Sequence, residues 1–248
     1  MTTFTDYQNI LPDPLNPIGT AGQPLSTGTK GPGFKSVRLT SKTPTLQTKT
    51  NSGRLLSRAV ASHSWNVSLA YNPMTEAEVS PIIAFLMGKR GGLLPFFVSL
   101  PQYRLPKSSS FSTWVQDSSN SIVPKSGSSL ISGQTTLLVD LGTSYAVGTN
   151  GKPTAGDLFT INDPNNSNHK KAYMITSVED ANTHNTSNTV GTSELKLHFS
   201  PGLQRSLSAT AKFVFLNPLI KVTANDDLQY ALNTENLYQI SLQLKEVQ

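Results

Sequence analysis

Residues 64–101 constrain the fold more than any other stretch, because a strand, a capped helix and a second strand follow one another there. Between Trp65 and Tyr71, apolar residues alternate with polar or small residues. A period of two predicts a strand with one buried face. Thr75 and Glu78 then form a capping-box pattern, in which the side chain of each can satisfy the backbone amide of the other. This pattern predicts that a helix begins at Thr75.

The helix expected over residues 75–89 should pack along a sheet. Its apolar residues recur at helical spacing, and Gly91 and Gly92 follow as a stop signal. The apolar run 93–100 then predicts a strand buried on both faces. The stripe that faces the sheet consists of Val79, Ile82 or Ile83, and Leu86. We expect the structural core of this region to contain Trp65, Tyr71, Thr75, Glu78, Leu86, Phe96 and Phe97.

The rest of the chain has the composition of a β protein. Only 14% of its residues are charged, while Ser, Thr, Asn, Gly and Pro are abundant, as in short strands joined by polar turns. Cysteine is absent, which excludes a disulfide framework and a thiolate metal site. No apolar run approaches the roughly 20 residues that cross a bilayer. The sequence therefore predicts a mainly β protein without a membrane partner.

Proline, serine and strand patterns divide the chain into regions. The N-terminal residues are rich in Pro and Gly and predict an extended arm, which is either docked on a neighbouring subunit or disordered. A serine-rich segment, residues 107–129, indicates a domain boundary. The last strand, residues 237–247, has one apolar face and needs a sheet. The expected regions are an arm of residues 1–33, a β domain of residues 34–101 and 219–248, and an inserted small β domain of residues 102–218.

Further strands are expected on both sides of the central stretch. Residues 34–40 and 44–50 are separated by turn-prone residues and predict a hairpin, and residues 54–60 predict another short strand. Five strand patterns with turn residues between them occupy residues 135–216. Their spacing is typical of a small antiparallel barrel or sandwich.

The sequence contains no recognisable catalytic or metal-binding constellation. Its histidines are scattered, and none stands at a metal-ligand spacing from another. Asp157 follows Gly156, and we interpret the pair as a turn that opens a strand rather than as a catalytic site. We therefore expect a protein that is not an enzyme and has no cofactor or metal. The four histidines are His63, His169, His184 and His198.

The formal net charge of +5 does not by itself indicate a nucleic-acid partner. Proteins that bind a phosphate backbone gather Lys and Arg on one face. Here these residues are spread along the whole chain, and the tightest groups are the pairs Lys89-Arg90 and Lys170-Lys171. The sequence therefore predicts a mildly basic, solvated surface and no specific nucleic-acid binding.

A series of short motifs extends from the central stretch into the second half of the chain. The motifs are Trp65, Tyr71, Met74-Thr75, Glu76 to Glu78, Phe85-Leu86, Gly91-Gly92, Pro95-Phe96-Phe97, Pro101, then residues 156–161, 172–176 and 195–203. This order resembles tail-tip and baseplate proteins of tailed bacteriophages, of the distal tail type. The resemblance implies a tail-tube-like β-barrel or sandwich with one flanking α-helix, and a second small β-barrel domain.

The same resemblance implies a structural role in a virion. The protein would form a ring at the end of the tail tube and join the tube to baseplate or receptor-binding parts. Its partners would be copies of itself, with a hexamer expected, and other tail-tube and baseplate proteins. It would be located in the virion tail or baseplate, after assembly in the host cytoplasm.

Two other classes of function stay open at the level of the sequence. A carbohydrate-binding or adhesion module of a virion would use the same β architecture and would expose Tyr103, Phe111 or Trp114 on a concave face. A cell-wall hydrolase would need a pair of acidic residues at a fixed separation in a cleft. The sequence indicates no such pair.

Overall fold

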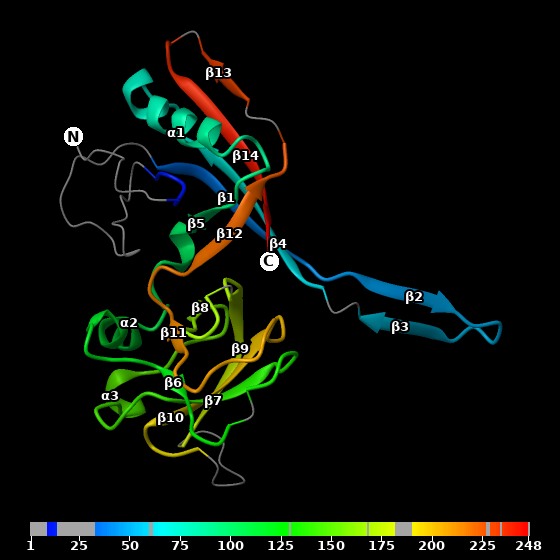
Figure 1. Ribbon diagram of the computed structural model, residues 1–248, viewed down its shortest axis with the longest axis vertical. Helices are drawn as coiled ribbons and strands as arrows, with labels where there is room; N and C mark the ends of the chain where they lie inside the picture. The colour runs from blue at the N-terminus through cyan, green and yellow to red at the C-terminus, as the bar shows by residue number, and fades with distance from the viewer. Residues whose placement is uncertain are drawn as a thin grey trace. The chain divides into compact units, whose positions relative to one another are not determined.

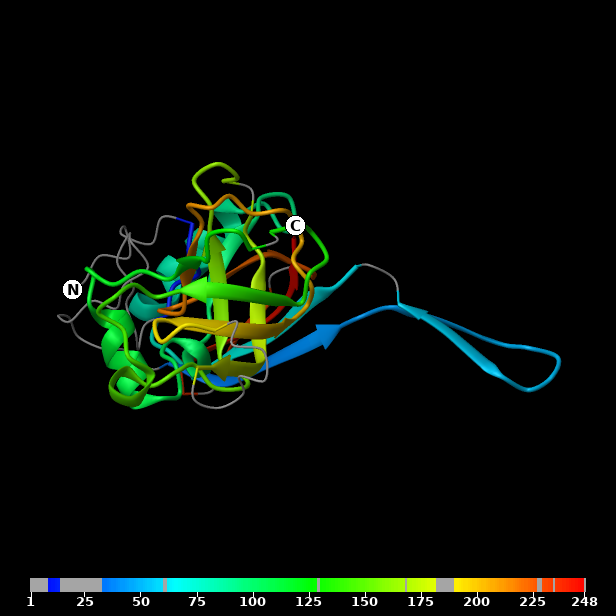
Figure 2. The ribbon, with the colours of Figure 1, turned by 90° about the horizontal axis from the view of Figure 1, so that it is seen from below.

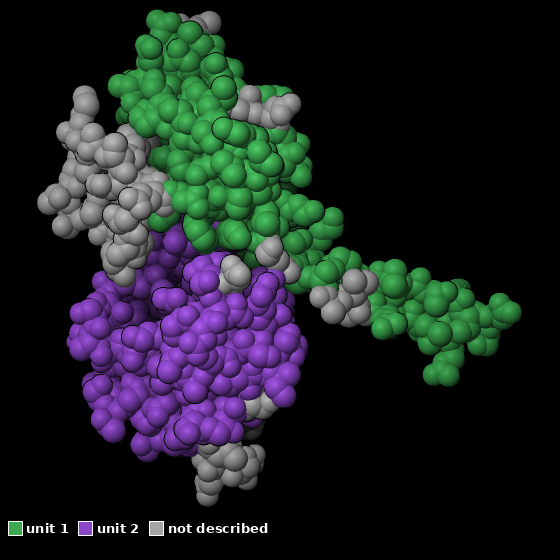
Figure 3. Space-filling model, in the orientation of Figure 1, with its two compact units in different colours: residues 1–98, 221–247 green, residues 99–220, 248 purple. Residues whose placement is uncertain are grey.

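The protein is mainly β and divides into two compact units (Figure 3). Unit 1 comprises residues 1–98 and 221–247, and unit 2 comprises residues 99–220 with residue 248. The two boundaries fall within three residues of those expected from the sequence. The computed structural model describes residues 9–13, 33–59, 62–128, 130–167, 169–181, 190–226, 229–233 and 235–247.

Unit 1 is built on a half-barrel sheet (Figure 1). The C-terminal strand lies between strands from distant parts of the chain, with Leu242 opposite Leu69 of β4 and Ala224 of β12 opposite Leu244. Residues at the end of the chain therefore complete a sheet that begins near residue 34. The strand order is β1 (Phe34–Lys42), β4 (Ser64–Tyr71), β14 (Tyr238–Glu246), β12 (Leu219–Ala224) and β5 (Phe96–Ser99), with β13 (Tyr230–Leu232) paired to β14.

Helix α1 (Glu76–Gly88) covers the apolar face of this sheet, as Figure 1 shows. Thr75 is its N-cap residue, and the Glu78 carboxylate accepts hydrogen bonds from both the amide and the hydroxyl of Thr75, each 2.9 Å long. The helix buries Val79, Ile82 and Leu86. The opposing strands bury every second side chain, which gives the core residues Trp65, Val67, Leu69, Tyr71, Ile240, Leu242 and Leu244.

Three expectations for the central stretch need correction. Thr75 is exposed and Glu78 half-buried, so these two residues start the helix and do not belong to the core. Phe96 is buried, whereas Phe97 is half-buried. The strand begins only at Phe96, because the residues before it form a turn that leaves the expected strand residues Leu93 and Leu94 exposed.

Unit 2 is a nearly closed six-stranded barrel. The amide of Phe213 in the first strand of the sheet donates to the carbonyl oxygen of Ile122, beside the last strand, over 2.9 Å. This bond brings the two ends of the sheet together. The strand order is β11 (Lys212–Val214), β8 (Leu158–Asn162), β9 (Ala172–Asp180), β10 (Glu194–Ser200), β7 (Thr136–Asp140) and β6 (Val123–Pro124).

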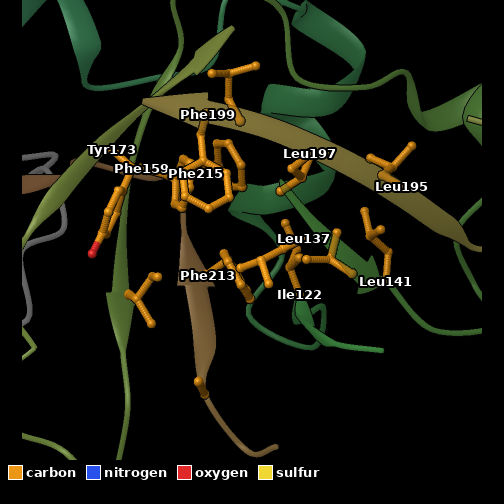
Figure 4. Close-up of a cluster of buried hydrophobic side chains, with 14 of the residues drawn as sticks. Ile122, Leu137, Leu141, Phe159, Tyr173, Leu195, Leu197, Phe199, Phe213 and Phe215 are labelled. Atoms are coloured by element: carbon orange, nitrogen blue, oxygen red, sulfur yellow. The ribbon is translucent and has the colours of Figure 1, made fainter. Parts of the chain in front are cut away.

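An aromatic cluster fills this barrel (Figure 4). Phe159 is fully buried at its centre, with ring centroids 5.2 Å from Phe215, 5.5 Å from Tyr173 and 5.6 Å from Phe199. Edge-to-face and offset ring pairs at such distances stabilise a core beyond the area they bury. The expected second small β-barrel domain is thus present as unit 2.

Helix α2 (Ser109–Gln116) lies in the serine-rich segment that the sequence suggested only as a boundary. Its N-cap is Ser108, whose hydroxyl accepts from the amide of Phe111, and it buries Phe111 and Trp114 in the core of unit 2. Serine is a weak helix former, so burial of two aromatic side chains three residues apart overrides local preference. Unit 2 also contains the short helices η2 (Pro101–Tyr103) and α3 (Val147–Asn150).

The expected hairpin of residues 34–40 and 44–50 is wrong. Strand β1 pairs with β4 in the half-barrel sheet, with Val37 opposite Leu69. Strand β2 (Thr45–Lys49) instead pairs with β3 (Leu55–Ala59) in a separate two-stranded sheet. The apolar side chains of β1 thereby join the core face of β4, which a hairpin with the wholly exposed β2 would not achieve.

Residues 9–13 pack on unit 1 itself. Ile10 and Leu11 are buried, and the backbone forms a parallel bridge with β5, in which the amide of Leu11 donates to the carbonyl oxygen of Phe97 over 2.7 Å. The hydroxyl of Tyr71 donates to the carbonyl oxygen of Pro12. For these residues, the expectation of an arm docked on a neighbouring subunit is wrong. The other residues of the expected arm, apart from Gly33, lie outside the described residues.

Candidate assembly surface

The β2–β3 hairpin extends away from the rest of unit 1 (Figures 1 and 2). Its turn is closed by hydrogen bonds from the amide of Thr50 to the carbonyl oxygen of Arg54 and from the amide of Gly53 to that of Thr50, each 2.9 Å. Gly53 has a φ of +82°, a conformation that glycine adopts without steric cost. The sequence Asn51-Ser52-Gly53 therefore fixes the hairpin locally.

The hairpin exposes apolar side chains on both of its faces. Leu46 and Leu56 are 66% and 52% exposed. The register places Leu46 opposite Arg58 and Leu56 opposite Thr48, so the two leucines are diagonal neighbours on one face. Leu55, opposite Lys49, lies on the other face and is 64% exposed. This hairpin thus offers leucine side chains to a partner and buries none of them in its own unit.

An isolated two-stranded hairpin is at best marginally stable in water, because it has no third strand or helix to cover a face. Every residue of β2 is exposed, and so are the residues of β3 whose side chains are described. Burying three leucines elsewhere would gain about 1.5–3 kcal/mol each. Those gains are large enough to hold the hairpin on a partner surface.

The outer edge of strand β1 is a second candidate for contact with a partner. It stands at one end of the strand order of the half-barrel sheet, and β4 is its one strand partner among the described residues. An edge strand of nine residues presents a row of backbone amides and carbonyls with which another strand can pair. The opposite edge, β5, is already covered by residues 9–13.

Three residues that the sequence analysis considered for catalysis or metal binding make structural hydrogen bonds. The carboxylate of Asp157 accepts from the amides of Thr154 (2.8 Å) and Lys107 (3.1 Å), so it ties a turn together, as interpreted from the sequence. His63 contacts the hydroxyl of Ser41 (2.9 Å), and His198 contacts the Glu179 carboxylate (2.8 Å). His184 lies outside the described residues.

His169 is fully buried in unit 2, beside the fully buried Tyr173. Its Nε2 atom lies 2.8 Å from the Tyr173 hydroxyl, which also accepts from the amide of Gln204 over 3.0 Å. Burial lowers the pKa of His169 to about 4. The ring is therefore neutral at pH 7, with its hydrogen bond directed into the fold.

Across the described ranges, His, Asp and Glu side chains form no cluster of three or more that could hold a metal ion. Phe111 and Trp114, two of the aromatic residues expected at a sugar site, are buried in the core of unit 2, and Tyr103 is half-buried. The exposed hairpin leucines are the residues that sequence reasoning missed. Alternating strand patterns state which residues share a face, but not whether that face is covered.

Comparison with known proteins adds no relative: neither protein-family profiles nor curated protein sequences give a significant match to this chain. Within the described residues, no helix has the length and apolar content needed to traverse a bilayer.

Proposed function

We propose that this protein is a non-enzymatic structural subunit of a bacteriophage tail tip or baseplate, forming a ring at the end of the tail tube. The observation that carries the proposal is the exposed β2–β3 hairpin, which offers Leu46, Leu55 and Leu56 to a partner. The motif order described above, which resembles distal tail proteins, supports the same role.

A second copy of the chain is the partner that we propose for the hairpin. A surface that binds a different patch on an identical neighbour makes a head-to-tail contact, which closes into a ring when the rotation permits. The edge of β1, which has no strand partner in the described ranges, and the exposed hairpin are two different patches on one unit. Six copies form the ring in this proposal, and other tail-tube and baseplate proteins bind to it in the virion.

The test removes the hairpin without disturbing the sheet. Lys42 and Ser64 are opposite each other in the β1–β4 pair, so an Asn-Gly two-residue turn can replace residues 43–63. We expect this variant to fold, with a thermal midpoint within about 5 °C of that of the wild type. A change of about 1 kcal/mol in the free energy of unfolding produces a shift of that size. We expect it to stay monomeric in analytical ultracentrifugation, while the wild-type protein forms rings visible by electron microscopy.

A same-length control separates the leucines from the hairpin backbone. Leu46→Ser with Leu56→Ser removes the apolar pair from one face and should weaken assembly, whereas Thr45→Ser with Gln47→Asn should leave it unchanged. Rings formed equally well by the deletion variant would contradict the role of the hairpin. Antibody labelling of purified particles at a place other than the tail end would contradict the location.

A further inference from the structure

The outward face of the half-barrel sheet gathers basic residues that are far apart in the chain. On each strand, the residues between the buried ones point away from the core. The strand registers identify these outward residues on β1, β4, β14 and β12, and we call the set the basic sheet face. It comprises Ser36, Arg38, Thr40, Lys42, Ser64, Asn66, Ser68, Ala70, Gln239, Ser241, Gln243, Lys245, Leu219, Lys221 and Thr223.

Four cations lie on this face, and none of its side chains is acidic. Arg38 shares a row with Ser68 and Gln243, while Lys245 lies in the next row, opposite Asn66. Lys42 is opposite Ser64 at the end of β1, and Lys221 is two residues from Thr223, the partner of Lys245. Strands lie about 4.8 Å apart, so the four strands place these charges within about 15 Å across the sheet.

No described acidic side chain pairs with these cations. Arg38, Lys42 and Lys245 are exposed and Lys221 is half-buried, and none of the four forms an ion pair with another described residue. Three lysines of unit 2 differ, because each forms an ion pair. There Lys125 pairs with Glu194, Lys152 with Asp180 and Lys196 with Glu179. These three lysines have an acidic partner, whereas the four cations of the basic sheet face have none among the described residues.

The side chains around the four cations narrow the chemistry of the ligand. Phosphodiester backbones are contacted by Lys and Arg together with Ser, Thr, Asn and Gln, which are the residue types found here. Proteins that bind single-stranded nucleic acids stack the bases on aromatic side chains, and helices that lie in a membrane surface bury an apolar face there in addition to their charge contacts. The basic sheet face has no aromatic residue, and its apolar side chains are those of Ala70 and the half-buried Leu219 at the start of β12.

We propose that the basic sheet face binds the phosphate backbone of double-stranded DNA without reading its base sequence. A duplex presents closely and regularly spaced phosphates, so a rigid sheet with four cations can contact it at any sequence. The proposal goes beyond the structural role proposed above and does not require a ring, because a single subunit carries the whole face.

The test measures binding of the full-length protein to a fluorescent duplex of 30 base pairs and mixed sequence, by anisotropy. About four phosphate contacts predict that affinity falls about a hundredfold between 50 and 200 mM salt. The variant Arg38→Gln, Lys42→Gln, Lys221→Gln, Lys245→Gln should lose at least about tenfold in affinity at 50 mM salt and most of its salt dependence. Duplexes of unrelated sequence should bind equally well.

A matched control separates the face from net charge. Arg90→Gln, Lys170→Gln, Arg205→Gln, Lys212→Gln also removes four positive charges, from three exposed residues and one half-buried residue outside this face. We expect it to bind within about threefold of the wild type, because it removes no proposed contact. Thermal unfolding of both variants verifies that each is folded.

Three results would overturn the proposal. The first is an equal loss of affinity in the two four-residue variants, which would make binding a matter of net charge. The second is tighter binding to a single strand of the same length. The third is absence of duplex binding at 50 mM salt, with or without binding to vesicles of anionic phospholipid.

Discussion

Units 1 and 2 both contain six-stranded sheets, but they use them in opposite ways. In unit 2 the sheet bends until Phe213 contacts the carbonyl oxygen of Ile122, and the interior is filled by aromatic rings around Phe159. In unit 1 the sheet stays half open, and one face packs under α1 while the other remains polar. The two end strands of the barrel sheet meet, whereas in the half-barrel one edge of β1 has no strand partner among the described residues.

This difference indicates where intermolecular contacts belong. A closed barrel removes its sheet edges and buries its apolar side chains without help. An open sheet with an exposed hairpin, and with a basic face that has no acidic partner among the described residues, has backbone, apolar and charged groups that can contact partners. The contacts proposed above, with a second copy of the chain and with DNA, therefore both involve unit 1, whereas the core of unit 2 is formed by its own residues.

The largest expected effect is the loss of the ring at the centre of the barrel. Phe159→Ala should lower the free energy of unfolding of unit 2 by about 3–5 kcal/mol and leave unit 1 unchanged. The two tryptophans allow the units to be measured separately, since Trp65 lies in unit 1 and Trp114 in unit 2. Denaturant titrations would follow fluorescence in Trp65→Phe and Trp114→Phe backgrounds. If Phe159→Ala shifted the unfolding midpoint equally in both backgrounds, the two units would unfold together.

A somewhat smaller effect is expected where residues 9–13 cover the edge of the half-barrel. Leu11 is 2% exposed, so Leu11→Ala should destabilise unit 1 by about 2–5 kcal/mol. The conservative Leu11→Met should cost less than about 1.5 kcal/mol. Both would be measured with Trp65 as the single reporter. An unchanged midpoint for Leu11→Ala would mean that this segment is dispensable and that β5 tolerates an open edge.

The smallest expected effect is a pH dependence confined to unit 2. The pKa of His169 is about 4 in the folded protein and about 6.5 when unfolded. The unfolded state therefore binds more protons between these values, and stability is lost as the pH falls from about 6.5 to 4, by up to about 3 kcal/mol. His169→Asn should remove this loss. Urea titrations across this pH range, followed by the fluorescence of Trp114, would measure this loss of stability. If the free energy of unfolding of the variant fell equally steeply with pH, the prediction would be wrong.

Local patterns in the sequence were sufficient for the first strand and the helix at the centre of unit 1, but they placed the start of the second strand too early. The alternation from Trp65 to Tyr71 and the pair Thr75 and Glu78 act over two to four residues, so they do not depend on distant partners. The same holds for the last strand, whose alternation correctly implied that it needs a sheet. The mainly β class follows from many such patterns together.

The tertiary structure alone decided which strands pair and which faces stay open. Strand β1 resembles β2 in pattern, yet its pairing with β4 leaves its apolar residues half-buried, whereas every residue of β2 is exposed. Helix α2 forms because the barrel core receives Phe111 and Trp114. Arg38 and Lys245 belong to one face only through the registers of β1, β4 and β14. Pairing, closure and clustering depend on contacts between residues far apart in the chain, and no local pattern encodes them.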